Sequence, residues 1–334
     1  MAGATTPELD PALRRCLKSE ECVAFIGSGP SMSQYGSWRD LINHVCKQCG
    51  VVHQVDEQSS ADDLLDAAEE AKRANEDGYY KAIGLFLGRI PSTNPLYDVL
   101  MRIPFRAYVT VNLDPLLAFE ARKPRGTLNT DILDPSRAAQ SPEPEYPHKV
   151  EVYPSLRAAS INAGTIFFLH GLVEEDSVPG RGSIVLSRSE FDKAYGPSGM
   201  LNSFLHQLLT FHPICFIGCR LDEPPFVEVF KRCAASQEHI LAQHGGSRPE
   251  RYILLAEEHV LAVAADGTPM LSGQDASVNR KEAEDRHYRD KGITVLRYDR
   301  MDESHRGLRL MFEKESNLRR RPPMRLGLST GVNP

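Results

Sequence analysis

The sequence predicts an α/β fold with a Rossmann-like, doubly wound parallel sheet, and three observations lead to this prediction. Six short apolar runs are each bounded by turn-forming residues. The runs are continuous instead of alternating, which is typical of strands covered by helices on both faces. Segments with helical spacing separate the runs, so strand and helix alternate. The expected strands are residues 22–26, 107–111, 165–169, 214–217, 251–255 and 293–298.

The helical segments follow from apolar residues that recur three and four positions apart. Residues 60–89 contain enough of them for two amphipathic helices, which we expect to form a small helical insertion at about 55–100. The expected helices are residues 38–49, 60–88, 114–122, 189–211, 225–244 and 303–317.

The remaining stretches define the predicted domain boundaries. Residues 123–164 carry six prolines and are expected to form a long loop, with one further strand at 150–153. The tail, 319–334, contains glycines and prolines and is expected to be flexible and basic. We therefore predict one domain at 1–318.

Composition excludes several classes of protein. The chain has 334 residues, with 45 acidic against 39 basic residues and a net charge of −6. A strong general affinity for nucleic acid needs a basic surface, which this balance does not provide. The basic run Arg319–Arg321 is explained by a solvated terminus or by a partner site. No apolar stretch has the length of a signal peptide core or a membrane span, so we expect a cytoplasmic protein without a membrane partner.

Cysteine usage agrees with a reducing compartment. The seven cysteines are scattered and odd in number, which is typical of reduced thiols. Cys46 and Cys49 have the spacing of a zinc knuckle, but no second pair lies at a usable distance. Because a structural zinc site normally needs four ligands, we expect no metal.

Polar residues follow four of the predicted strands. Ligands bind outside the carboxyl ends of the strands in such a sheet, so these residues are the candidates for a binding site. They are Gly27, Ser28, Gly29 and Ser31 after the first strand, Asn112 and Asp114 after the second, His170 after the third, and Gly218 and Cys219 after the fourth.

The glycine segment at 27–31 has two explanations. Glycines let a phosphate approach the backbone amides at the start of a helix, but the same residues also form a plain tight turn. The third glycine of the usual dinucleotide motif is missing, and no acidic residue clearly ends the next strand. These two departures disfavour a conventional hydride-transfer enzyme.

The other strand ends also allow a structural explanation. Asn112 could cap the following helix, and Asp114 could stabilise its first turn. His170 follows an apolar run and precedes a glycine, so it is either a buried core histidine or a group that handles a proton or a ribose. Gly218 could simply end its strand in a turn.

Read together and in order, these segments resemble the sirtuin superfamily across roughly residues 20–315. Sirtuins have a Gly-Ala-Gly-x-Ser loop, a Thr-Gln-Asn-x-Asp strand end, a His-Gly pair and a Gly-Thr-Ser or Gly-x-Ser turn. The corresponding segments here are "GSGPS" at 27–31, "TVNLD" at 110–114, "HG" at 170–171 and "GCR" at 218–220. Val111 and Arg220 depart from the usual residues, so the contacts at those two positions are open.

Finer features resemble the bacterial sirtuin-like branch found in antiphage defence. They are the segments "GSWRDLI", "RIPFRAYVTVNLDPLLAFEA", "SIVLSRSEFDKAYG" and "FIGCRLDEPPF". Deacylating sirtuins carry two Cys-x-x-Cys pairs after the His-Gly strand, whereas this chain has only Cys215 between His170 and Gly218. Without that zinc module, the resemblance favours cleavage of NAD over deacylation of a protein.

The resemblance implies a role for each candidate residue. Asn112 holds a water or a ribose hydroxyl, and His170 binds the ribose hydroxyls and accepts a proton. Asp114 orients the nicotinamide carboxamide. Gly27, Ser28, Gly29 and Ser31 hold the diphosphate, while Gly218 and Cys219 line the adenosine side.

The resulting hypothesis is an NAD+ glycohydrolase that acts as an effector of abortive infection. We expect a homo-oligomer or a partner to control it, such as a HerA-type ATPase or a short Argonaute. An NAD-dependent protein deacylase or ADP-ribosyltransferase is the first alternative. A non-catalytic module that binds NAD or ADP-ribose is the second.

Overall fold

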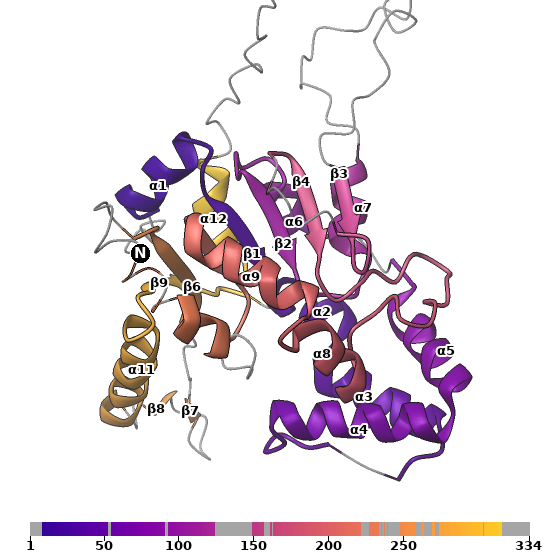
Figure 1. Ribbon diagram of the computed structural model, residues 1–334. Coiled ribbons are helices and arrows are strands. Elements are labelled where there is room, and N and C mark those ends of the chain that lie inside the picture. The colour runs from indigo at the N-terminus through magenta and orange to yellow at the C-terminus, as the bar shows by residue number, and fades with distance from the viewer. Residues whose placement is uncertain are drawn as a thin grey trace, which may run out of the picture.

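A seven-stranded parallel sheet forms the centre of the molecule (Figure 1). The computed structural model describes residues 9–52, 55–90, 93–123, 149–156, 161, 163–221, 227–233, 235, 237, 239, 248–257, 262–263, 269–270, 274–302 and 304–315. The strands are β1 (Val23–Ile26), β2 (Ala107–Thr110), β3 (Lys149–Val152), β4 (Thr165–Phe168), β5 (Ile214–Ile217), β6 (Arg251–Glu257) and β9 (Thr294–Asp299). The sequence prediction of a doubly wound α/β fold is confirmed.

The order of the strands is β3-β4-β2-β1-β5-β6-β9. From β1 the chain builds the β2, β4 and β3 side of the sheet, and then crosses to β5 on the other side of β1. Ile26 at the end of β1 pairs with Thr110 of β2 and with Ile217 of β5. The order therefore reverses between β1 and β5, and in open parallel sheets ligands bind outside the carboxyl ends of strands at such a point.

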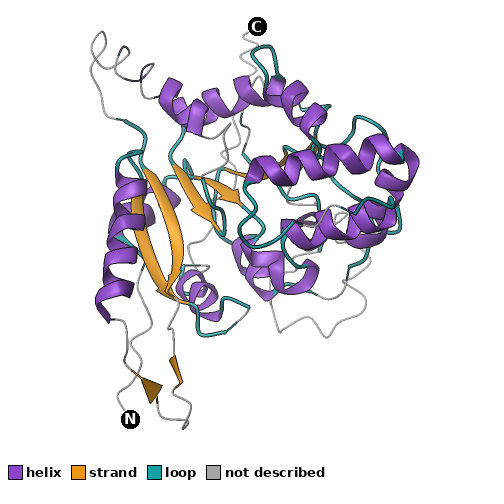
Figure 2. Cartoon of the chain, turned by 90° about the horizontal axis from the view of Figure 1, so that it is seen from below, coloured by secondary structure: helices purple, strands orange, loops and turns teal. Residues whose placement is uncertain are grey.

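Helices cover both faces of the sheet (Figure 2). Their bounds are α1 (Pro11–Lys18), α2 (Met32–Tyr35), α3 (Trp38–Gln48), α4 (Ala61–Ala74), α5 (Glu76–Leu87), α6 (Pro95–Leu100), α7 (Leu116–Arg122), α8 (Arg188–Tyr195), α9 (Met200–Phe211), α11 (Gln274–Arg289) and α12 (Arg306–Glu313). A short antiparallel pair, β7 (Ala262–Val263) and β8 (Pro269–Met270), forms a second sheet.

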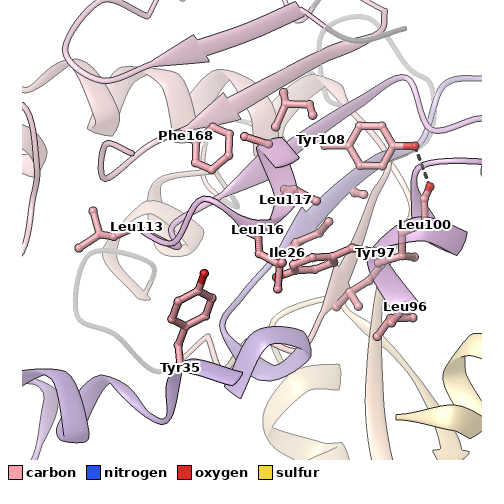
Figure 3. Packing of buried hydrophobic residues seen from close by; sticks show 14 of the residues in the cluster. Ile26, Tyr35, Leu96, Tyr97, Leu100, Tyr108, Leu113, Leu116, Leu117 and Phe168 are labelled. Carbon is pink, nitrogen blue, oxygen red and sulfur yellow. Dashed lines mark hydrogen bonds between the residues drawn. The ribbon is translucent and has the colours of Figure 1, made fainter. Parts of the chain in front are cut away.

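Alternate residues of the central strands enter two separate cores. Ala24 and Ile26 of β1 join the core that includes α1, α6, α7 and α12. Val23 and Phe25 join the core formed with α8 and α9. This explains the continuous apolar runs, because both faces of the strand are buried. Figure 3 shows part of the first core, in which the Tyr108 hydroxyl donates to the Leu100 carbonyl at 2.8 Å.

Helices α3, α4 and α5 pack together at one end of the molecule, beyond α2 (Figure 1). Capping boxes begin two of them: Ser37 pairs with Asp40 at the start of α3, and Ser60 pairs with Asp63 at the start of α4. The sequence prediction of two helices within residues 60–89 agrees with α4 and α5. Helix α4 also contacts α8, which ties these helices to the covered sheet.

One predicted helix is divided in the structure. The sequence pattern suggested a single helical segment at 189–211, but α8 ends at Tyr195 and α9 begins at Met200. The intervening residues "GPSG" include a proline, which cannot continue an α-helix. A side chain at Gly199 would also lie 2.2 Å from the Ala194 carbonyl oxygen. Helices α1, α2, α6 and α11 were not predicted.

Several predictions fall on residues outside the described set. These are residues 124–148, 157–160 and 162 of the predicted long loop, part of the helix at 225–244, residues 303, 316 and 317 of the helix at 303–317, and the whole tail at 319–334. The strand expected at 150–153 corresponds to β3. Among the helices that the structure describes, none has the length and apolar character needed to cross a bilayer.

Candidate functional site

The predicted site residues lie at four adjacent strand ends. β4, β2, β1 and β5 are consecutive neighbours in the sheet, and each is followed by candidate residues. The glycine segment follows β1, while Asn112 and Asp114 follow β2. His170 follows β4, and Gly218 with Cys219 follows β5. The parallel sheet therefore collects residues from distant parts of the sequence at one edge.

The loops after β1 and β5 pack backbone against backbone. A side chain at Gly27 would lie 2.5 Å from the Gly218 carbonyl oxygen, and one at Gly29 would lie 2.8 Å from the Gly218 Cα. The Gly27 amide donates to the Ile217 carbonyl and the Gly29 amide to the Gly218 carbonyl, both at 2.9 Å. In this conformation neither amide is available to a phosphate, so the predicted diphosphate contact of these glycines stays a prediction. Ser28, between them, is exposed.

Position 218 requires a glycine for two reasons, its backbone conformation and the lack of space for a side chain. Its φ of +62° lies in the left-handed region, and a side chain there would lie 2.3 Å from Cδ of Pro30. The adjacent Cys219 is half-buried, and its Sγ lies 3.8 Å from the Phe25 carbonyl oxygen. These glycines are therefore required where the loops after β1 and β5 approach each other closely, a contact that the sequence analysis did not predict.

Asn112 is held in one orientation by its amide nitrogen. Its Nδ2 donates to the Gly27 carbonyl at 3.0 Å, with the hydroxyls of Tyr97 at 3.3 Å and Ser31 at 3.4 Å. A carbonyl oxygen only accepts hydrogen bonds, so the contact with Gly27 determines which amide atom is nitrogen. Among the described residues, none donates to Oδ1, which leaves this oxygen as an acceptor. The suggestion that Asn112 caps a helix is wrong, because α7 has Pro115 at its N-cap.

Asp114 and Ser31 form a buried pair beside Asn112. The Ser31 hydroxyl donates to Asp114 Oδ2 at 3.0 Å, and the Leu116 amide donates to Asp114 Oδ1 at 3.1 Å. Asp114 therefore stabilises the first turn of α7. Burial raises the pKa of the Asp114 carboxyl from 3.8 to about 6, against the effect of these hydrogen bonds. With 2% of its surface exposed, Ser31 faces this pair more than it faces solvent.

His170 bonds to an aromatic residue of α8. Its Nε2 lies 2.7 Å from the Tyr195 hydroxyl, and its ring also contacts Phe191 edge-on, with centroids 6.0 Å apart. Burial lowers the pKa of the His170 imidazole from 6.5 to about 3, so the ring is neutral at neutral pH. No described residue forms a hydrogen bond with Nδ1, which remains available to a ligand.

Sequence reasoning missed three residues around the site. Tyr97 of α6 supports Asn112, and Tyr195 of α8 bonds to His170. His305 follows β9, has a φ of +55° and bonds to the Tyr298 hydroxyl at 2.6 Å. A hydrogen bond that the His305 imidazole donates to the Gly29 backbone raises the pKa of His305, against the larger, lowering effect of burial, and it places this residue beside the glycine loop. No local pattern distinguishes these residues from ordinary core aromatics or loop residues, because their partners are far away in the sequence.

A pocket with a volume of about 410 Å³ adjoins the surroundings of His170. It includes Phe191 and Tyr195, the two aromatic residues that contact the imidazole. Its lining is mixed in polarity and comes from α4, α8, the start of α9 and residues beyond β5, namely Asp62, Leu65, Arg188, Phe191, Asp192, Tyr195, Gly196, Pro197, Asn202, Glu228, Val229 and Arg232.

The thiols of the Cys-x-x-Cys pair have separate contacts. Cys46 Sγ lies 3.6 Å from the Ala67 carbonyl oxygen, and Cys49 Sγ lies 3.7 Å from that of Asn75. Within the part of the chain that the structure describes, no three histidine, cysteine or acidic side chains gather closely enough to hold a metal ion.

The chain belongs to the SIR2-like domain family, whose model matches residues 106–289. This range contains Asn112, His170 and Gly218, whereas the glycine segment after β1 precedes it. No curated protein matches the chain.

A comparison with solved structures also matches Sir2 proteins. A Sir2 homologue in complex with NAD is 12% identical, with coverage of 92% of this chain and 94% of that one and a TM-score of 0.39. A structure described as the basis for the mechanism and regulation of Sir2 enzymes is 10% identical, with coverage of 92% and 97% and a TM-score of 0.34. A mutant Sir2 homologue in complex with ADP-ribose is 11% identical, with coverage of 84% and 97% and a TM-score of 0.34.

Proposed function

We propose that this protein is an NAD+ glycohydrolase, which cleaves NAD+ to nicotinamide and ADP-ribose. The observation that carries the proposal is that two hydrogen-bond acceptors lie at the ends of neighbouring strands. Asn112 Oδ1 follows β2 and His170 Nδ1 follows β4, and no described residue occupies either atom. Membership of the SIR2-like family supports an NAD-consuming chemistry at this edge of the sheet.

Cleavage of NAD+ does not require a covalent intermediate with the protein. The nicotinamide is a cationic leaving group, so the reaction requires a stabilised ribosyl cation and a positioned water. The Asn112 carbonyl can accept a hydrogen bond from that water or from a ribose hydroxyl. The neutral His170 imidazole can accept a proton as water adds. Most of the rate enhancement would come from placement and electrostatics.

The remaining residues would hold the rest of the dinucleotide. We assign the diphosphate to the loop containing Gly27, Ser28, Gly29 and Ser31, with exposed Ser28 as its first contact. Asp114 would orient the nicotinamide carboxamide, since carboxylate oxygens can accept further hydrogen bonds beside those from Ser31 and Leu116. Gly218 and Cys219 would line the adenosine side. No metal takes part in this scheme.

The direct test is release of nicotinamide from NAD+ by the purified chain, with and without candidate partners. We expect His170→Ala and Asn112→Ala each to lower the rate at least ~100-fold, because both reaction-side acceptors are needed. The thermal midpoint of each variant should stay within a few degrees of the wild type.

Two matched variants provide the controls. His212 is half-buried like His170 and its pKa is also lowered by burial, but it precedes β5 and so lies at the opposite edge of the sheet. Asn43 of α3 bonds to both backbone groups of Val55. His212→Ala and Asn43→Ala should keep normal turnover. Full turnover by both site variants would exclude these roles for Asn112 and His170.

The same assay separates the alternatives. Cleavage that depends on an added acetyl-lysine peptide would indicate a protein deacylase, and transfer of ADP-ribose to protein would indicate a transferase. Tight binding of NAD or ADP-ribose without any nicotinamide release, even with partners present, would indicate a non-catalytic module.

The biological part of the proposal is an effector of antiphage defence by abortive infection. It is supported by the resemblance of segments such as "GSWRDLI" to the defence branch of the sirtuins. An uncontrolled enzyme would drain cellular NAD, so we propose that oligomerisation or a partner such as a HerA-type ATPase or a short Argonaute controls it in the cytoplasm. Light scattering tests the oligomer. Cellular NAD during phage infection, compared between wild type and His170→Ala, tests the role.

A further inference from the structure

Tyr195 is the last residue of α8, and its hydroxyl lies 2.7 Å from His170 Nε2. The two rings meet edge-on at 83°, with centroids 5.7 Å apart. Tyr195 is 8% exposed and His170 is half-buried, so the contact is shielded from much of the solvent. A hydrogen bond of this length in a partly desolvated setting constrains both the orientation of the imidazole and the position of its proton.

The position of Tyr195 is determined by its own surroundings. Its ring packs against Phe191, one helical turn earlier, with centroids 4.7 Å apart. Its backbone carbonyl accepts a hydrogen bond from Asn202 Nδ2 at 3.1 Å. At the start of the same helix, Glu190 bonds to Lys72 of α4 at 2.9 Å. These contacts hold the helix at both ends, and a tyrosine has only two side-chain torsions to restrict.

The imidazole of His170 is neutral at neutral pH, so one ring nitrogen carries a proton and the other is an acceptor. Burial is the reason, since it lowers the pKa of His170. If Nε2 carries the proton, it donates to the Tyr195 oxygen and the Nδ1 lone pair remains open. Tyr195 also lines the 410 Å³ pocket, and a phenolic oxygen can accept the Nε2 proton while its own hydroxyl proton is donated elsewhere.

We propose that Tyr195 is a positioning residue for His170: its oxygen accepts the Nε2 proton and so leaves the Nδ1 lone pair to take a proton at the ribose of NAD. The proposal rests on the proposed NAD+ hydrolysis for its kinetic consequence. Its structural part, the tautomer of His170, does not depend on any activity.

The proton transfer balances as follows. The bond between the ribosyl carbon and nicotinamide breaks, and nicotinamide departs neutral with the electron pair. Water adds its oxygen to the ribosyl carbon, and the proton that it loses goes to Nδ1 of His170. The resulting imidazolium keeps its Nε2–H bond to Tyr195, and the Nδ1 proton then passes to solvent. Tyr195 keeps its own proton throughout.

The first experiment observes the tautomer by nitrogen NMR of the full chain labelled at histidine. The signal of His170 is identified by its loss in His170→Ala. At neutral pH we expect a protonated Nε2 and an unprotonated Nδ1 in the wild type, and a mixture of the two tautomers in Tyr195→Phe. A protonated Nδ1 in the wild type would overturn the proposal, and this spectrum requires no variant at Tyr195 to fold. An unchanged tautomer in Tyr195→Phe would overturn it as well.

The second experiment measures nicotinamide release. Tyr195→Phe keeps the ring and removes the hydroxyl, so we expect kcat to fall about tenfold while KM for NAD changes less than about twofold. The control, Tyr252→Phe, loses one tyrosine hydrogen bond, to Glu250, near the start of β6 at the opposite end of the sheet, and should leave both constants unchanged.

Two kinetic outcomes contradict the role of Tyr195. Unchanged turnover would show that the hydroxyl does not position His170, and faster turnover would show that it blocks Nε2 in the free protein. If the wild type releases no nicotinamide under any condition, the proposed function fails, and the NMR result alone then decides how Tyr195 acts on His170.

Discussion

Two polar clusters in this protein, one around Glu190 and one at the strand ends, differ in how many of their hydrogen-bond acceptors have a donor. At Glu190, both carboxylate oxygens are occupied: Lys72 and Tyr80 bond to Oε1 at 2.9 Å, while Tyr79 and the amides of Leu186 and Ser187 bond to Oε2 at 3.0–3.2 Å. At the strand ends, Asn112 Oδ1 and His170 Nδ1 have no bond from any described residue. The saturated cluster joins α4 and α5 to α8, whereas the strand ends keep acceptors for a ligand.

The comparison predicts that the Glu190 cluster contributes stability and the strand-end site contributes little. The largest effect is expected for Glu190→Ala, which leaves Lys72 and two tyrosine hydroxyls without their partner. Breaking a buried, hydrogen-bonded ion pair in this way costs about 3–5 kcal/mol. Urea unfolding followed by circular dichroism measures the loss.

Glu190→Gln provides the control for that measurement, because it keeps the shape and part of the hydrogen bonding. Its free energy of unfolding should lie between those of the wild type and Glu190→Ala. A loss below about 1 kcal/mol in Glu190→Ala would mean that the cluster is no more than a surface ion pair, and the contrast with the strand ends would disappear.

The next effect concerns Asp114, whose folded-state pKa of about 6 lies above the ordinary value of 3.8. The folded protein then binds a proton more tightly than the unfolded chain does. The contribution of Asp114 to the free energy of unfolding should therefore be most favourable below about pH 4, fall as the pH rises to about 6, and stay level above that. The contribution is on the order of 2–3 kcal/mol.

Asp114→Asn tests this assignment, since the amide keeps the size of the side chain and cannot titrate. The difference between wild type and variant should change between pH 4 and 6 and be constant at higher pH. A parallel pH dependence in both proteins would show that other groups cause the change.

The smallest expected effect is the difference in stability loss between two glycine variants, which separates the cost of backbone conformation from the cost of close packing at the strand ends. Gly218 and Gly182 both have a positive φ, of +62° and +74°, but only Gly218 has neighbours within reach of an added side chain. Gly182→Ala should cost about 1 kcal/mol for conformation alone. Gly218→Ala should cost about 1–2 kcal/mol more, because the loops after β1 and β5 must separate.

Chemical denaturation of the two glycine variants measures this difference directly. Equal losses would mean that the loops separate at no cost. In that case their contact would not hold the strand-end site in shape.

Much of the fold could be predicted from local patterns. All six apolar runs are strands, and each boundary agrees within about two residues, because burial on both faces leaves a signal in consecutive residues. Helix α1 was missed although Asp10 and Pro11 form a standard helix start. The helix is short, and the burial of its apolar residues Leu13 and Leu17 is apparent only once they are seen to pack in the core beside the sheet.

The position of the candidate residues at the strand ends could be predicted, whereas their hydrogen bonds could not. Asn112 and His170 follow apolar runs directly, and the parallel arrangement brings such positions to one edge. The roles of Gly27 and Gly29 could not be read in the same way, because their amides bond to the β5 segment, almost 190 residues away in the sequence. Tyr195 carries no signal of its own, since a tyrosine at the end of an amphipathic helix resembles any other core aromatic.

The sequence by itself determined the strands, the alternation of strands with helices and the four polar strand ends, because each depends on residues that are neighbours along the chain. Tertiary structure alone decided which atoms of those polar residues are occupied and which are open. Hydrogen-bond partners such as Lys72 with Glu190 and Asn112 with Gly27 come from separate elements. The glycine segment at 27–31 shows both sources at once: its glycines mark a turn in the sequence, and the contact with Gly218 explains why Gly27 and Gly29 admit no side chain.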